Sequence, residues 1–116
     1  MYEDDPVKVY LREMGKVPPL TREQEMECVR HIRAQDEKAE WAKKDLVESA
    51  LHLVVSIAQK HPSDHIHILD LIQTGNIALL TAVQAFADST AVNFSAFAAP
   101  LIERAITKAA IKARPQ

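Results

Sequence analysis

The side chains with the greatest capacity for chemistry in this 116-residue sequence are a group of histidines and a single cysteine. His61, His65 and His67 lie close to Asp64, a spacing that could supply two or three ligands to a metal ion. The segment also contains proline and no cysteine, so we expect an exposed loop without a metal. Cys28 has no partner for a disulfide within the chain, and as a small core residue it fits a reducing compartment such as the cytoplasm.

Catalytic motifs do not accompany these side chains. The sequence has no nucleophile elbow, no glycine-rich phosphate loop and no paired catalytic carboxylates. Its only glycines are Gly15 and Gly75. We therefore expect a protein that is not an enzyme and that uses no cofactor.

Charge is distributed unevenly along the chain, although the net charge is only −2. Residues 61–103 contain four acidic residues and no lysine or arginine. Basic residues return near the C-terminal end as Arg104, Lys108, Lys112 and Arg114. A nucleic-acid-binding domain normally presents a basic face, and the middle of this chain offers none. The apolar runs are short and the N-terminus is acidic, so neither a membrane span nor a signal peptide is expected.

Apolar residues recur at helical spacing nearly throughout, and no stretch alternates like a strand. The pattern predicts an all-α fold, a compact bundle of about five helices in a single domain of residues 1–116. Residues 1–20 would form an N-terminal helical arm and connector, and residues 21–116 the helical core. The expected helices cover about residues 5–15, 21–34, 37–60, 68–87, and from 95 or 100 to 113.

Capping residues and prolines set the expected helix ends. Asp5 before Pro6 is typical of an N-cap, and Thr21 with Gln24 forms a capping box. Pro100 should begin the last helix or kink it, leaving residues 95–99 irregular, because proline lacks the amide hydrogen and crowds the carbonyl four residues earlier. In the long third helix the expected buried stripe comprises Trp41, Val47, Leu51, Val54, Ile57 and Ala58.

Two segments carry a specific resemblance to a known family. The first contains Asp5-Pro6-Val7-Lys8, Tyr10-Leu11-Arg12-Glu13-Met14-Gly15 and Leu20-Thr21-Arg22-Glu23. The second contains Lys44-Asp45-Leu46-Val47-Glu48, Leu53-Val54-Val55-Ser56-Ile57-Ala58, Leu69-Asp70-Leu71-Ile72-Gln73 and Gly75-Asn76-Ile77. In this order they resemble the region before the core domain, and the core domain itself, of the sigma-70 family of bacterial RNA polymerase sigma factors.

The resemblance implies a binding surface for core RNA polymerase. In the family, the helix with the Leu-Asp-Leu-Ile-Gln string binds the clamp helices of the β′ subunit. Carried over by position, the surface would comprise Leu51, Val54, Leu69, Asp70, Gln73, Asn76 and Leu80. Helical spacing places Asp70, Gln73 and Asn76 or Ile77 together, apart from the buried face. Thr74 departs from the family, which usually has glutamate there.

The segment that melts promoter DNA in the family is strongly altered here. Pro100 and Leu101 stand where the family has two tryptophans, and Ser89, Thr90 and Asn93 stand where it has three basic residues. Glu103 replaces an arginine, and Ala87 replaces the acid of the flipped-base pocket. Each lost aromatic platform removes roughly 1–3 kcal/mol of base stacking, and lost cations weaken phosphate binding. Residual DNA contacts could come from Lys8, Arg12, Arg104, Thr107 and Lys108.

Three functions remain open. The first is a sigma-like regulator that binds core polymerase but melts promoter DNA poorly. The second is a divergent working sigma factor, or a fragment of one, that recognises promoter DNA; if the chain ended at Gln116 it would lack a reader of the minus-thirty-five element. The third is a sigma mimic that sequesters an anti-sigma factor. The missing basic residues favour the first and third, and the retained clamp-binding string favours the first.

Overall fold

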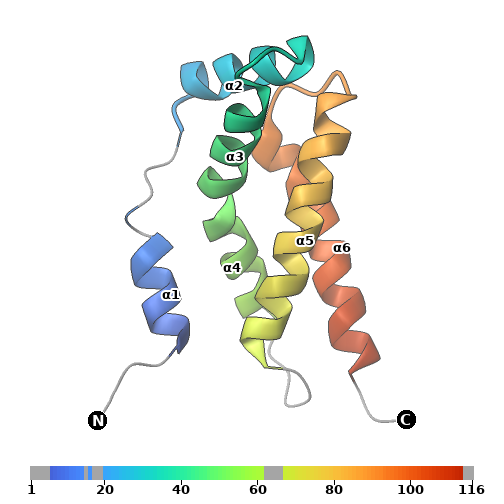
Figure 1. Cartoon of the computed structure of the whole chain (residues 1–116). Helices are drawn as coiled ribbons and strands as arrows, with labels where there is room; N and C mark the ends of the chain where they lie inside the picture. Colours follow the sequence, from blue (N-terminus) through green and yellow to red (C-terminus); the bar gives the residue numbers. More distant parts are fainter. Residues whose placement is uncertain (1–5, 15, 17–19, 62–66, 114–116) are drawn as a thin grey trace.

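The computed structural model describes residues 6–14, 16, 20–61 and 67–113, and these residues form helices and connecting turns without a strand (Figure 1). The helices are α1 (Pro6–Met14), α2 (Arg22–Ala34), α3 (Ala39–Ser49), α4 (Leu51–Gln59), α5 (Ile68–Ala87) and α6 (Phe94–Lys112). The all-α prediction is confirmed. Asp5 and Gly15, the expected ends of the first helix, lie outside the described residues.

The capping box and α5 form as predicted. The Thr21 hydroxyl accepts from the backbone N–H of Gln24 at 3.1 Å, and the Gln24 side chain accepts from the N–H of Thr21 at 2.9 Å. The reciprocal bonds satisfy two of the amides that a helix start leaves without partners. α5 runs from Ile68 to Ala87, the bounds that the sequence predicts.

The expected third helix is two helices, α3 and α4, which meet at Ala50. This residue has φ −103° and ψ 2°, and its N–H donates to the carbonyl of Val47 at 3.1 Å, which tightens the chain at the junction. Alanine is the best helix former, so local preference does not explain the break. Ala50 is only 1 % exposed, which points to core packing as the cause.

The expectation of an irregular stretch before Pro100 is wrong, because α6 is helical from Phe94 onwards with Pro100 inside it. The side chain of Asn93 accepts from the N–H of Ala96 at 2.9 Å and caps the helix. Phe94 and Ala98 are buried in the core. Their burial, together with the cap, stabilises the first turns and offsets the backbone bond that proline cannot make.

The core lies where α5 packs along α6 and against α4, with α3 continuing the line of α4 and α2 lying across one end (Figure 1). Phe86 and Phe94 are its largest fully buried side chains, and the Phe86 ring meets those of Phe94 and Phe97 at centroid distances of 5.2 and 5.5 Å. Trp41 is not part of the core. It is 54 % exposed, and α3 instead buries Ala39, Ala42 and Leu46.

α5 is also the one described helix that is long and apolar enough to cross a membrane. Its apolar face is occupied by the core, since residues such as Leu79 and Phe86 are fully buried against neighbouring helices. Its other face carries exposed polar side chains such as Asp70 and Gln73. These features are typical of the central helix of a bundle.

Candidate functional site

α5 presents one continuous exposed face beside its buried one. The exposed residues recur every three or four positions, and we call this set the α5 outer face: Asp70, Gln73, Ile77, Leu80 and Gln84. Ile77 is 66 % exposed and Leu80 is 59 % exposed. Two large apolar side chains flanked by polar ones on a single helix face are typical of a protein-binding surface with an apolar centre and a polar rim.

The fold fixes both the start and the seating of α5. His67 caps the helix, because its Nδ1 accepts from the N–H of Leu69 at 3.1 Å. Asp70 therefore stands in the first turn, where the helix dipole favours a carboxylate. Further along, Gly75 allows a close approach, since a Cβ there would lie 2.6 Å from Cγ1 of Val54 and 2.9 Å from Cδ1 of Ile106.

The structure places most of the predicted polymerase-binding residues on or beside this face. Asp70, Gln73 and Leu80 belong to the α5 outer face, whereas Leu69 and Asn76 are half-buried on α5, and Leu51 is half-buried on α4. These positions stay predictions as contact residues.

Val54 requires a correction as a contact residue. It is 0 % exposed and lies under Gly75 in the core, so it supports α5 from below and is not accessible to a partner. Ile77 was missing from the predicted set. Helical spacing had placed it with Asp70 and Gln73 as an alternative to Asn76, but the family positions carried over did not include it.

α1 borders the Asn76 edge of the α5 outer face. It packs against α4 (Figure 1). The hydroxyl of Tyr10 accepts from Nδ2 of Asn76 at 3.4 Å. Oδ1 of Asn76 is buried and has no hydrogen-bond partner among the described residues. A buried acceptor without a donor is costly, so this contact is imperfectly satisfied.

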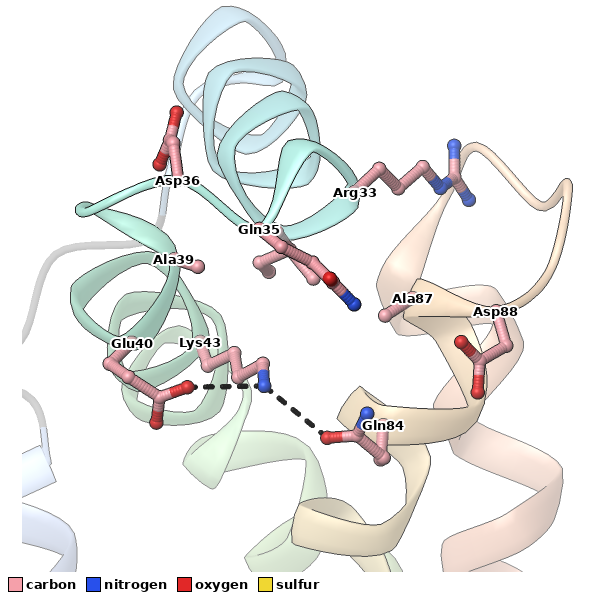
Figure 2. Close-up of a pocket in the computed structure, with 10 residues that line it drawn as sticks. Arg33, Gln35, Asp36, Ala39, Glu40, Lys43, Gln84, Ala87 and Asp88 are labelled. Atoms are coloured by element: carbon pink, nitrogen blue, oxygen red, sulfur yellow. Dashed lines mark hydrogen bonds and ion pairs between the residues drawn. The ribbon is translucent and has the colours of Figure 1, made fainter.

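A groove of about 390 Å³ runs between α3 and α5, next to Leu80. Val47 and Val83 form its apolar part, and Lys44 and Glu48 stand on the α3 side. Glu40, Lys43 and Gln84 also line a polar pocket of about 380 Å³ between the α2–α3 turn and the end of α5, shown in Figure 2.

The side chains of that polar pocket mainly connect elements of the fold. Lys43 Nζ donates to Glu40 Oε2 at 3.2 Å and to Gln84 Oε1 at 3.3 Å, which joins α3 to α5 (Figure 2). Arg33 donates to the carbonyls of Phe86 at 3.3 Å and Ala91 at 2.8 Å, which joins α2 to the loop after α5. We therefore assign these groups a structural role.

A further polar cluster closes the end of α2. The buried His31 donates from Nδ1 to Asp36 Oδ2 at 2.6 Å, and its Nε2 lies 3.2 Å from Glu27 Oε2. The hydrogen bond from His31 holds the pKa of Asp36 below its ordinary value, and the hydrogen bond from Arg30 does the same for the pKa of Glu27. Burial raises the pKa of the Cys28 thiol, which makes it less reactive.

Metal binding finds no support in the part of the chain that the structure describes, where no three His, Cys, Asp or Glu side chains gather as ligands. His65 and Asp64 lie outside the described residues. His67 caps α5, and His61 Nε2 pairs with Oε2 of Glu103 on α6.

The residues predicted to keep DNA contacts do not form a single site. Lys8 and Arg12 are on α1, on the other side of the α4–α5 layer from α6, which carries Arg104 and Lys108 (Figure 1). Thr107 donates its hydroxyl hydrogen to Glu103 Oε2 at 3.2 Å, so this hydroxyl is engaged within the helix.

The polar residues of the altered DNA-melting segment serve the local fold. Ser89 donates to the carbonyl of Phe86 at 2.8 Å and accepts from the N–H of Ala91 at 3.1 Å, which shapes the turn after α5. Asn93 caps α6. Phe94 is buried, and Phe97 is half-buried against Phe86.

A larger groove of about 650 Å³, which the sequence pattern does not predict, lies between α2 and the start of α6. Its apolar members include Met26, Val29 and Val92, and Val92 is the most exposed large apolar residue described. Spacing on α2 alone could not reveal it, because Val92 comes from a loop about 60 residues later.

Known proteins resemble this chain along nearly its whole length. Residues 5–38 match the family Sigma-70 factor, region 1.2, and residues 46–115 match Sigma-70 region 2. The chain is 42% identical over 106 residues to the RNA polymerase sigma factor SigA of Lactococcus lactis subsp. cremoris, 43% to that of Clostridium acetobutylicum and 42% to that of a Bacillus species.

These alignments cover 91% of this chain but only 29%, 27% and 27%, respectively, of the three relatives. The chain therefore spans less than a third of the length of the sigma factors that it matches. The two matched regions follow one another in the order of the family, and the second alone covers more than half of the chain. This chain belongs to the sigma-70 family.

Proposed function

We propose that this chain acts in transcription initiation by binding core RNA polymerase through the α5 outer face, and that it melts promoter DNA poorly. Its partner on the enzyme would be the clamp helices of β′, in the cytoplasm. The observation that carries the proposal is the pair of exposed side chains, Ile77 and Leu80, beside Asp70 and Gln73. They lie in the helix that the family resemblance associates with the clamp.

The dimensions of the α5 outer face suit a helical partner. From Asp70 to Gln84 it extends about 21 Å, at about 1.5 Å per residue, which matches roughly four turns of a facing helix. Burying Ile77 and Leu80 would stabilise the complex by up to about 1.5–3 kcal/mol each. Asp70 adds a carboxylate that a cationic side chain of the partner can pair with, which selects orientation more than affinity.

The proposed weakness in DNA melting rests on what the altered segment does instead. Ser89 and Asn93 are used in a turn and a helix cap, and neither carries a charge for phosphate. Pro100 is exposed but has no aromatic face on which an extruded base could stack. An extruded base therefore finds little to offset its lost stacking and pairing.

The competing proposal, a divergent sigma factor that recognises promoter DNA, has one observation in its favour. Arg104 and Lys108 are exposed one turn apart on α6 and could contact phosphates. Two cations supply only a small part of the electrostatic affinity that DNA-binding proteins need, so we place this function second.

The test is the affinity of the full chain for isolated β′ clamp helices, measured by titration calorimetry. Asp70→Lys should weaken binding at least about tenfold, because it replaces an attractive charge pair with a repulsive one. Asp88→Lys is the matched control, since it makes the same reversal on an exposed residue at the other end of α5.

Asp88→Lys should bind like the wild type. The melting temperatures of both variants should be close to that of the wild type, which would confirm that each variant remains folded. Equal affinity of wild type and Asp70→Lys would contradict the proposed surface. Failure of the wild type to bind the clamp, combined with capture of an anti-sigma factor, would favour the sigma mimic.

A further inference from the structure

α1 lies against the Asn76 edge of the α5 outer face, which a polymerase partner would need to reach. Tyr10 is half-buried against the core, and its hydroxyl accepts from Nδ2 of Asn76, at the edge of the α5 outer face. Asn76 and Leu51 were both predicted to contact the polymerase, yet both are half-buried in this arrangement. A partner helix laid on α5 would meet α1 at this edge.

The described contact between Tyr10 of α1 and Asn76 of α5 has the character of a weak, exchangeable one. α1 packs mainly against α4, and the hydrogen bond between Tyr10 and Asn76 is long at 3.4 Å. The side-chain oxygen of Asn76, Oδ1, is buried and accepts no hydrogen bond from the described residues. The closed arrangement therefore carries a desolvation cost that water or a partner donor would relieve.

We propose that α1 is a displaceable cover on the polymerase-binding surface: Tyr10 occupies Asn76 in the free protein, and the partner must displace α1 to reach the Asn76 edge. This inference rests on the proposed function and adds a regulatory step to it. When α1 leaves, Oδ1 of Asn76 becomes free to accept from a donor of the incoming helix.

A cover of this kind lowers the apparent affinity without changing the surface itself. The apparent dissociation constant is the intrinsic one divided by the fraction of molecules that are open. If α1 is closed about nine-tenths of the time, the partner binds about tenfold more weakly than it would to an uncovered surface. Removing the Tyr10 contact should therefore tighten binding.

The experiment compares the full-length wild type with Tyr10→Ala, which removes the ring and the acceptor, and Tyr10→Phe, which removes only the hydroxyl. Titration with isolated β′ clamp helices should show binding about threefold to tenfold tighter for Tyr10→Ala and a smaller gain for Tyr10→Phe. Glu13→Ala is the matched control on α1, because Glu13 is exposed and pairs locally with Lys16 at 3.0 Å. It should bind like the wild type.

A second readout is independent of the partner. Exchange of the Asn76 side-chain amide hydrogens, followed by nuclear magnetic resonance, should be faster in Tyr10→Ala than in the wild type. Unchanged or weaker clamp binding by Tyr10→Ala would overturn the cover while leaving the proposed function intact. If no variant bound the clamp, the proposed function would fail, and unchanged Asn76 exchange would overturn the cover as well.

Discussion

Gly75→Ala tests the close approach that seats α5 on its neighbours. The added Cβ would lie 2.6 Å from Cγ1 of Val54, 2.9 Å from Cδ1 of Ile106 and 3.4 Å from Cγ2 of Ile102. The Ile106 atom ends a flexible side chain and can move. Cγ1 of Val54 cannot move easily, because a valine in a helix has one strongly preferred rotamer, so α4 itself would have to shift.

Two opposing effects set the magnitude. Overpacking of this kind costs about 1–3 kcal/mol, whereas replacing glycine by alanine within a helix contributes about 1 kcal/mol. The net expectation is a loss of up to about 2 kcal/mol in the free energy of unfolding. The double variant Gly75→Ala/Val54→Ala should lose less free energy of unfolding than the sum of the two single variants, because the shorter side chain at position 54 makes room for the new Cβ. The expected difference, or coupling, is about 1 kcal/mol.

The assay is urea denaturation followed by circular dichroism for the wild type, both single variants and the double variant. Thr81→Ala serves as the control for helix preference, because Thr81 is exposed on the same helix and its replacement should be neutral or slightly stabilising. A Gly75→Ala variant more stable than the wild type, or a coupling near zero, would refute the close contact between α5 and α4.

Three further outcomes are expected. Thr21→Ala should lower the free energy of unfolding by about 0.5–2 kcal/mol, measured by urea denaturation, because it removes half of the capping box; no loss would mean that the box is dispensable. Acid should destabilise the fold through Asp36 and Glu27, because their pKa values in the folded chain are lower than the ordinary 3.8 and 4.5. Their contribution to the stability of the fold is complete above the ordinary pKa values and is lost as the pH falls through the folded ones. Asp36→Asn should therefore flatten the dependence of the melting temperature on pH below about 4, and an unchanged slope would contradict this role. With core polymerase, the chain should leave a minus-ten duplex closed, as reported by a fluorescent base analogue, and should reduce run-off transcription by a complete sigma factor; strong opening with productive transcripts would favour the divergent sigma factor.

Local signals were sufficient where capping residues and helical spacing agreed. The capping box of Thr21 and the bounds of α5 follow directly from sequence, and several matching strings in two segments carried the family resemblance. Family membership also confirms the prediction that the chain is not an enzyme. Asp70, Gln73 and Leu80 are exposed, and their role as polymerase contacts stays a prediction.

The remaining differences arise from tertiary packing, which spacing along one helix cannot report. The break at Ala50 and the helical stretch before Pro100 both run against local preference and coincide with buried residues. Trp41 illustrates the same limit, because apolar spacing placed it on the buried face of the helix. In the structure the buried face of α3 is formed by other residues, such as Ala42, and Trp41 is exposed. Helical spacing correctly placed Val54 in the buried stripe, whereas the resemblance placed it on the contact surface, because the resemblance does not distinguish contact residues from those beneath them.

Arg33 has a consequence for cooperativity. It belongs to the segment that matches region 1.2, yet its guanidinium binds two carbonyls in the segment that matches region 2 and lies 5.3 Å from the centre of the Phe86 ring. The family boundary therefore passes through the middle of a packed core. Severing the chain between the two regions should leave neither piece independently stable, and the intact domain should unfold in one transition as a single thermodynamic unit.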